Sequence, residues 1–297
     1  MRRFQEVDVF SPEPLQGNPV AVVVDAEGLT SEQMQRFTRW TNLSEATFLL
    51  PPTDPAASYR VRIFTAAGEL PFAGHPTLGS CHAWLRAGGQ PRDEEHIVQE
   101  CGAGLVRIRR SDGQLAFRAP PLRRSGRVAE ANLARIARVL RIERAAIIDS
   151  QWVDNGPGWV AVMLASVEAV LAVSPSMPSG DPERVDIGIV GAYPPGAPCA
   201  YEVRAIFSND RGELVEDPVT GSLNASLAQW LVGSGRFEPP YLASQGTLLG
   251  RTGRPRISQA ADGAIWVGGA THTLIEGQVR LGETGEPLAE SGRAPSG

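Results

Sequence analysis

The sequence contains no lysine, so all 28 of its basic residues are arginines, set against 33 acidic residues and a net charge of −5. Without lysine the protein cannot form a Schiff base with a carbonyl substrate or with pyridoxal phosphate. It also lacks the lysine of a phosphate-binding loop and the strand lysine of a kinase. Arginine stays protonated in proteins and carries protons poorly. Acid/base chemistry must therefore come from carboxylates, the four histidines, tyrosines or cysteines.

Other classes of protein also need features that are scarce here. The three cysteines (Cys81, Cys101 and Cys199) form no CxxC pair and no disulfide framework, which agrees with a reducing compartment. The longest apolar runs are far shorter than a membrane span, and the first residues lack the apolar stretch of a signal peptide. The mild acidity argues against a nucleic-acid partner, and the histidines lack metal-ligand spacing. We therefore expect a cytoplasmic protein with no metal site that binds neither nucleic acid nor a membrane.

Four short motifs recur in the same order in the two halves of the chain, about 140 residues apart. They are residues 20–22 with 160–162, 59–64 with 201–207, 68–70 with 212–214, and 76–80 with 218–222. A repeat of this length predicts two similar lobes related by a pseudo-twofold axis. The alternative is two unrelated strand-turn-helix units that share common turn chemistry.

Local patterns within each half predict both strands and helices. Alternating apolar residues at 60–64, and at their counterparts in the second half, indicate half-buried strands. Thr30 and Gln33 have the spacing of a capping box, which predicts a helix from Ser31 to about Trp40. An apolar stripe predicts another helix over residues 132–140. Together these signals predict two mixed α+β lobes, each with many short strands around an apolar helix.

A polar stretch that follows two prolines suggests where the lobes divide. We expect residues 1–122 to form the first lobe and residues 123–272 the second. A strand at about 273–282 would complete the first lobe. Residues 283–297, rich in Gly, Pro, Ser and Glu, are expected to be a flexible tail.

The turns at 74–77 and 217–222 are the candidate ligand site. Pro76 and Pro218 suit the first turn of a helix, which would put His75 and Asp217 near the N-caps. Duplicated lobes place ligands in the cleft between them. Two helix N-termini that face this cleft could hold a carboxylate or phosphate from both sides. The alternative is that both turns are ordinary helix caps.

A single glutamate, Glu45, precedes the apolar residues 47–50. A carboxyl group among apolar neighbours has a raised pKa, which suits general acid/base catalysis near neutral pH. The alternative is a solvated glutamate at the end of a strand. Because neither turn contains lysine or arginine, we expect a substrate carboxylate to rest on the backbone N–H groups of Gly74 and Gly221.

Several long motifs resemble the phenazine-biosynthesis PhzF-like family. They include GNPVAVV at 17–23, NLSEATF at 42–48, LPFAGHPTLG at 70–79 and EDPVTGS at 216–222. The similarity extends over roughly residues 4–275. The resemblance implies the α+β diaminopimelate-epimerase-like fold, in which two pseudo-symmetric lobes each form an incomplete β-barrel around a central helix. It also implies an isomerase without a cofactor, usually a homodimer, with its site between the lobes.

By this resemblance, Glu45 is the acid/base residue, and His75 and Asp217 are polar residues that line the site. The residues expected to bind substrate are Ser44, Gly74, Thr220, Gly221 and Ser222. Related epimerases use one cysteine from each lobe in these turns. None of the three cysteines of this chain stands there, so a racemisation that uses two thiols is excluded.

These observations lead to one functional hypothesis and two alternatives. The hypothesis is an isomerase in which Glu45 moves a proton on a small substrate that bears a carboxylate, such as an amino or hydroxy acid. Asp217 and His75 would orient the amine or hydroxyl group of that substrate. One alternative is an epimerase acting at a single chiral carbon, which needs acids on both faces. The other is a catalytically silent protein that binds a small acid.

Overall fold

The computed structural model describes residues 1–93, 95–111, 113–178, 183–209 and 211–281. The tail expected at 283–297 lies outside these residues. The strands of the first half are β1 (Arg2–Val9), β2 (Asn18–Val23), β3 (Glu45–Leu50), β4 (Tyr59–Thr65), β5 (Glu69–Leu70), β6 (His96–Cys101), β7 (Gly104–Ser111) and β8 (Gln114–Arg118). The later strands are β9 (Arg124–Gly126), β10 (Asp149–Asp154), β11 (Val160–Met163), β12 (Asp186–Ala192), β13 (Tyr201–Ser208), β14 (Leu214–Asp217), β15 (Tyr241–Gln245), β16 (Arg256–Gln259), β17 (Ile265–Gly269) and β18 (Thr271–Val279).

The helices lie on and inside this strand framework. They are α1 (Ser31–Thr41), α2 (Gly74–Arg86), α3 (Glu130–Leu140), α4 (Val167–Ala172) and α5 (Gly221–Gly233), with two 3₁₀ helices, η1 (Arg144–Ala146) and η2 (Thr247–Leu249). Across the described ranges, no helix is both long and apolar enough to cross a membrane.

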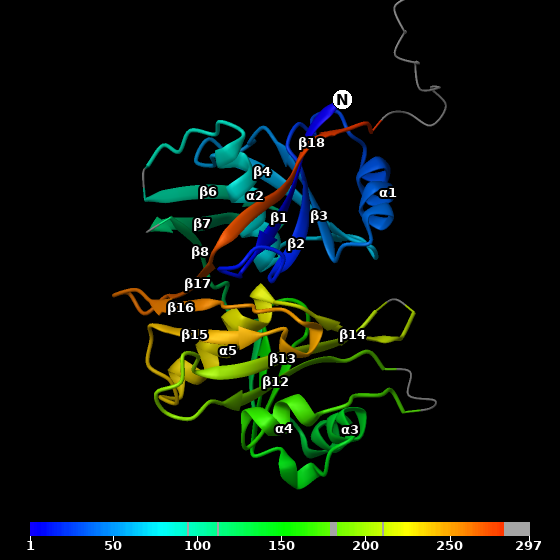
Figure 1. Cartoon of the computed structure of the whole chain (residues 1–297), viewed down its shortest axis with the longest axis vertical. Helices are drawn as coiled ribbons and strands as arrows, with labels where there is room; N and C mark the ends of the chain where they lie inside the picture. The colour runs from blue at the N-terminus through cyan, green and yellow to red at the C-terminus, as the bar shows by residue number, and fades with distance from the viewer. Residues whose placement is uncertain (94, 112, 179–182, 210, 282–297) are drawn as a thin grey trace, which may run out of the picture.

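Two lobes are stacked along the long axis of the molecule (Figure 1). The lobe drawn above contains α1 and α2, and the lobe drawn below contains α3, α4 and α5. Their strand pairings correspond, because β2 is parallel to β3 as β11 is to β12, and β4 is parallel to β6 as β13 is to β15. The fold is therefore the mixed α+β arrangement of two pseudo-symmetric lobes that the repeats predicted.

The last strands return to the first lobe. β17 pairs with β8, and β18 pairs with β1 from Val9 opposite Thr271 to Arg2 opposite Val279. The strand expected at about 273–282 is thus β18, which begins at Thr271. In Figure 1, β18 crosses the first lobe beside β1.

Each lobe encloses one central helix of 13 residues, α2 or α5. Both helices are built largely of small and apolar residues, so nearly every side can be buried. The core around α2 continues into the second half of the chain, because Val219, Ala225 and Ala228 belong to the same buried cluster as Val20 and Leu78. This shared core holds the N-termini of the two helices together.

The local predictions are confirmed, with small shifts in the element ends. α1 begins at Ser31, and its capping box is complete, since Thr30 and Gln33 bond each other's backbone. The helix predicted over 132–140 is α3, which begins two residues earlier, at Glu130. The strands predicted at 60–64 and 203–207 lie within β4 and β13.

The expected position of the second helix start was wrong. α5 begins at Gly221 with Thr220 as its N-cap, so Pro218 precedes the helix and Asp217 is the last residue of β14. A residue before proline is held in extended conformation, which keeps Asp217 in the strand. In the first lobe Pro76 does lie in the first turn, but the N-cap is Ala73 and His75 is the second residue of α2.

A buried ion pair fixes β14 and thereby Asp217. The Arg204 guanidinium donates two hydrogen bonds to Glu216 and two more to the backbone carbonyls of Val170 and Val173. The two side chains are only 5% and 13% exposed. A charge buried to this degree depends on its partner.

We expect Glu216→Ala to lower the free energy of unfolding by about 3–5 kcal/mol, because it leaves the Arg204 charge buried without a carboxylate. Urea denaturation measures this loss. The matched control is the double variant Arg204→Met/Glu216→Leu, which removes both charges and should recover part of the stability, because the carbonyls of Val170 and Val173 still lose their donor. If Glu216→Ala were as stable as the parent protein, the expectation would be contradicted.

Candidate active site

The N-termini of α2 and α5 meet at two glycines. A Cβ atom added to Gly74 would lie 2.7 Å from the Cα of Gly221, and one added to Gly221 would lie 2.7 Å from the Cα of Gly74. Any side chain at either position would overlap the backbone of the other helix. The sequence therefore needs glycine at both positions for the two helix ends to touch.

The first turns of both helices have free backbone donors. Neither N-cap residue, Ala73 or Thr220, gives its helix a side-chain cap. The backbone N–H groups of Gly74, His75, Gly221 and Ser222 donate no hydrogen bond to any of the described residues. Two sets of donors at the positive ends of two helix dipoles are thus available to one anion.

Glu45 and His75 lie against each other beside these helix ends. The Oε2 atom of Glu45 is 3.3 Å from the Nε2 atom of His75, and the side chains are 15% and 4% exposed. Neither atom has a hydrogen-bond partner among the described residues. A buried polar pair left in this state is a frequent sign of a functional group.

The protonation of this pair follows from its burial. Desolvation raises the pKa of the Glu45 carboxyl well above its usual value, and the negative charge of Asp217 raises it further. Desolvation lowers the pKa of His75 to about 3, although a hydrogen bond to the backbone carbonyl of Pro19 acts in the opposite direction. His75 is therefore neutral at physiological pH, whereas Glu45 holds a proton more tightly than an ordinary glutamate does.

Asp217 is held at the opposite side by the second lobe. The Thr220 hydroxyl donates to its carboxylate, and the Gln245 amide donates to both its backbone carbonyl and the Thr220 hydroxyl oxygen. Burial raises the pKa of Asp217, and the hydrogen bonds from Thr220 and Asn18 lower it in part. The site thus contains two carboxyl groups whose pKa values are both raised.

The structure brings together seven of the eight residues expected in the site. Glu45, His75, Gly74 and Gly221 are joined by the contacts given above, as are Asp217 and Thr220. Ser222, the second residue of α5, accepts hydrogen bonds from Asn155 at its carbonyl and from the Trp159 indole at its hydroxyl. Ser44 differs, because it is exposed just before β3 and no hydrogen bond within the described ranges joins it to the others.

Asn18 and Gln245 belong to the same network and were not predicted as site residues. The Asn18 amide nitrogen lies 3.0 Å from Asp217 Oδ1, 3.0 Å from the carbonyl oxygen of Val219 and 3.3 Å from His75 Nδ1. Asn18 could have been recognised in the sequence as a polar residue before proline at the start of an otherwise apolar strand. Gln245 could have been recognised because Gln99 occupies the same place in the first half of the chain.

The cysteines lie away from the helix ends that form the site. Cys81 is buried in α2 beyond its first turn, where burial raises its pKa to about 12. Cys101 ends β6, and Cys199 lies just before β13. Chemistry with a thiol from each lobe is therefore not available at this site. No group of three or more potential metal ligands occurs among the described residues.

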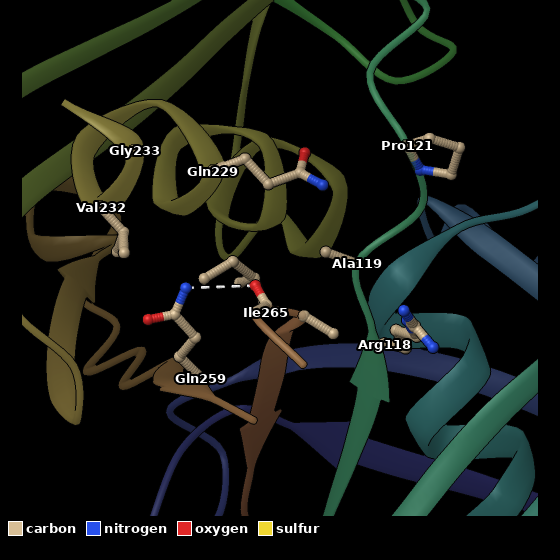
Figure 2. Close-up of a pocket in the computed structure, with 10 residues that line it drawn as sticks. Arg118, Ala119, Pro121, Gln229, Val232, Gly233, Gln259 and Ile265 are labelled. Carbon is tan, nitrogen blue, oxygen red and sulfur yellow. Dashed lines mark hydrogen bonds between the residues drawn. The ribbon is translucent and has the colours of Figure 1, made fainter. Parts of the chain in front are cut away.

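A cavity of about 560 Å³ lies at the other end of α5 (Figure 2). It is lined by Val232 and Gly233 at the C-terminal end of this helix, and by Ala119 and Ile265 on neighbouring segments. The carboxyl groups and the free helix donors are all at the N-terminal end. The candidate site is therefore at the helix N-termini and not at this cavity.

The chain is similar in sequence and in fold to known proteins. Residues 7–277 match the model of the family described as phenazine biosynthesis-like protein. The chain is 38% identical to a trans-2,3-dihydro-3-hydroxyanthranilate isomerase of Pseudomonas aeruginosa, over 95% of this chain and 100% of that protein. It is 33% identical to antisense-enhancing sequence 1 of Schizosaccharomyces pombe, over 93% and 97% of the two chains. The solved structure of a predicted epimerase from Pseudomonas aeruginosa superposes with a TM-score of 0.75 at 28% identity, over 94% and 99% of the two chains.

The contact between the two helix ends predicts a sharp difference between two glycines of α5. We expect Gly221→Ala to lower the free energy of unfolding by about 1–3 kcal/mol, because the new methyl group overlaps Gly74. Gly233→Ala adds the same group at the other end of α5, where nothing lies within 4 Å, and should be neutral or stabilising. Urea denaturation of both variants measures the difference, and equal stabilities would show that the helix ends do not meet as described.

Proposed function

The chain belongs to the phenazine biosynthesis-like protein family, and on that premise we propose that it is an isomerase that needs no cofactor. In this proposal it moves a proton between two carbon atoms of a small substrate that bears a carboxylate. The observation that carries the proposal is the buried Glu45 carboxyl in contact with neutral His75, beside two free helix N-termini.

The helix ends supply a place for the substrate carboxylate. The N–H groups of Gly74 and His75 from one lobe, and of Gly221 and Ser222 from the other, would donate to its oxygens. When a proton leaves the carbon next to a carboxylate, negative charge moves onto those oxygens. Preorganised donors in a site that excludes water stabilise this charge more strongly than they stabilise the starting substrate. The same four N–H groups would thus bind the substrate and lower the barrier.

Glu45 would carry the proton. As a carboxylate it takes a proton from one carbon, the electron pair shifts along the conjugated system, and the protonated Glu45 returns the proton to a second carbon. A raised pKa suits both halves of this cycle, because the group is a stronger base than an ordinary glutamate and still a usable acid. His75 contacts the carboxyl oxygen that moves the proton and would fix its orientation.

The similar isomerase of Pseudomonas aeruginosa suggests a substrate class. The trans-2,3-dihydro-3-hydroxyanthranilate of its name carries a carboxylate, an amine and a hydroxyl group on one unsaturated ring. In this proposal the helix donors would bind the carboxylate. The substrate amine or hydroxyl group would donate to Asp217 and to the side-chain oxygen of Asn155, which is buried and has no hydrogen-bond partner among the described residues. We therefore propose cyclic or short-chain acids with an adjacent amine or hydroxyl group as substrates.

Because of Asp217, an epimerase is a second candidate function. An epimerase that inverts one carbon needs an acid on each face, and Asp217 is a second carboxyl with a raised pKa. Its carboxylate is tied to Thr220 and Asn18, however, whereas Oε2 of Glu45 has no hydrogen-bond partner among the described residues. This difference favours Glu45 as the single acid/base group and hence isomerisation.

Glu45→Gln is the direct test of the mechanism. We expect this variant to lose proton exchange by at least about 10²–10⁴-fold, because the amide cannot accept a proton from carbon. NMR in D₂O, with trans-2,3-dihydro-3-hydroxyanthranilate and a panel of amino and hydroxy acids, follows the exchange. Deuterium at a second carbon with a shifted double bond supports isomerisation, whereas deuterium with loss of optical purity supports epimerisation. Normal exchange in the variant would rule out Glu45 as the base.

The same variant has a stability signature that does not need a substrate. In the native protein the pKa of Glu45 is raised, so its ionisation favours unfolding as pH increases from the unfolded-state pKa to the folded-state value. Gln does not titrate. The melting temperature of Glu45→Gln relative to the parent protein should therefore increase with pH above about 4.5.

The charge of Asp217 gives a separate prediction for the pH profile. Glu45 acts as a base only when ionised, so kcat/KM should fall as pH falls through its raised pKa. Asp217→Asn removes the negative charge that raises this pKa, and the acid limb of the profile should therefore move to lower pH. The measurement is the pH at which kcat/KM falls on the acid side of the profile. The maximum value of kcat/KM is not used, because it also depends on how Asp217 orients the substrate. A limb that stays in place would show that Glu45 does not determine it.

A further inference from the structure

The side chain of Asn18 belongs to the first lobe and forms hydrogen bonds with the second lobe. It is the first residue of β2 and is 1% exposed. Its amide nitrogen donates to Asp217 at the end of β14 and to the carbonyl of Val219 just before α5. The same nitrogen lies 3.3 Å from Nδ1 of His75 in its own lobe. One amide group thus touches both lobes beside the contact of Gly74 with Gly221.

The orientation of this amide is determined by its neighbours. Its two N–H groups match the two acceptors at 3.0 Å, a carboxylate and a carbonyl. With the amide reversed, its oxygen would face both of these oxygens and find no donor there. In the observed orientation the Asn18 oxygen is buried and has no hydrogen-bond partner among the described residues. The hydrogen bonds of the Asn18 side chain are therefore all made by its nitrogen.

The loop around Asn18 is itself anchored. The carboxylate of Asp8 accepts hydrogen bonds from the backbone of Gln16 and Gly17, and Arg251 donates to the carbonyl of Gly17. These hydrogen bonds fix the backbone that leads into Asn18. The charged groups that act on its acceptor Asp217 are Glu45 of the first lobe and the neighbouring Glu216, which is paired with Arg204.

We propose that Asn18 is the positioning residue of this site. By donating to Asp217 and to the Val219 carbonyl, it sets the separation between the lobe that bears Glu45 and the lobe that bears Asp217. It also holds the Asp217 carboxylate in one rotamer facing the substrate. The catalytic consequence rests on the proposed function, whereas the hydrogen bonds to the second lobe do not.

Two variants at this position separate positioning from simple support of the fold. Asn18→Leu keeps a similar volume and removes both donors, so Asp217 loses a hydrogen bond and its acid/base geometry relaxes. We expect kcat for trans-2,3-dihydro-3-hydroxyanthranilate to fall about 10²-fold, with KM changed less than about threefold. We also expect the pKa of Asp217 to rise, because a donor that favours its ionised form is gone.

Asn18→Asp keeps the shape of the side chain and replaces the donor with a second carboxyl group. Above neutral pH it should be less active than Asn18→Leu, because two carboxylates then repel each other. As pH falls, one of them takes up a proton and can donate to the other, so its activity relative to the parent protein should rise. A side chain that merely fills space would not produce this reversed pH dependence.

Gln5→Leu is the matched control. Gln5 is another buried amide of the first lobe, and its hydrogen bonds go to Ala83 and Thr273, away from the helix ends. This variant should lose stability without any change in kcat or in the pKa of Asp217. The control thus measures what the loss of a buried amide does by itself.

The pKa of Asp217 is measured without substrate, by NMR titration of ¹³C-labelled carboxyl groups, with Asp217→Asn to assign the signal. A raised pKa in Asn18→Leu, but not in Gln5→Leu, supports the inference even if the parent protein does not turn over the dihydro acid. An unchanged pKa together with kcat within about twofold of the parent value would overturn it. Failure of the proposed function is recognised separately, by exchange that persists in Glu45→Gln.

Discussion

The contact between the N-termini of α2 and α5 is the constraint on which the site depends. Two positive dipole ends placed side by side repel each other, so this arrangement needs negative charge nearby. The carboxyl group of Asp217, which accepts a hydrogen bond from the N-cap residue of α5, Thr220, lies close to these ends, and a bound anion would add negative charge there. The glycines at the contact exclude any side chain from the space between the helix ends. The same geometry therefore closes the core and leaves the backbone donors free for an anion.

Burial gives the site its chemistry at the expense of stability. Glu45, His75 and Asp217 are all removed from water, which shifts their pKa values toward the neutral forms. An interior of apolar residues would avoid this cost of removing polar groups from water. A protein selected for stability alone has no reason to place two carboxyl groups near each other between its lobes, and such pairs are typical of sites that move protons.

The sequence was sufficient to predict the duplication, the two central helices and most of the residues at the helix ends. These features depend on local patterns: apolar periodicity, glycine-rich turns and a glutamate before an apolar strand. It was not sufficient to align the two halves at the second turn, where Pro218 was matched to Pro76 although the helices themselves align at Gly74 and Gly221. Nor did it reveal Asn18, because the acceptors of its amide lie about 200 residues away and only the packed lobes bring them together.

The return of the last strands to the first lobe has a consequence for synthesis. Strand β1 lies between β2 and β18, so one of its edges stays unpaired on the ribosome until residues 271–279 have emerged. The strands β9 to β15 of the second lobe are contiguous in the chain and are available earlier. The lobe whose strands are translated first is thus the last to be completed. During this interval its open edge is a candidate for chaperone binding or for mispairing with another nascent chain.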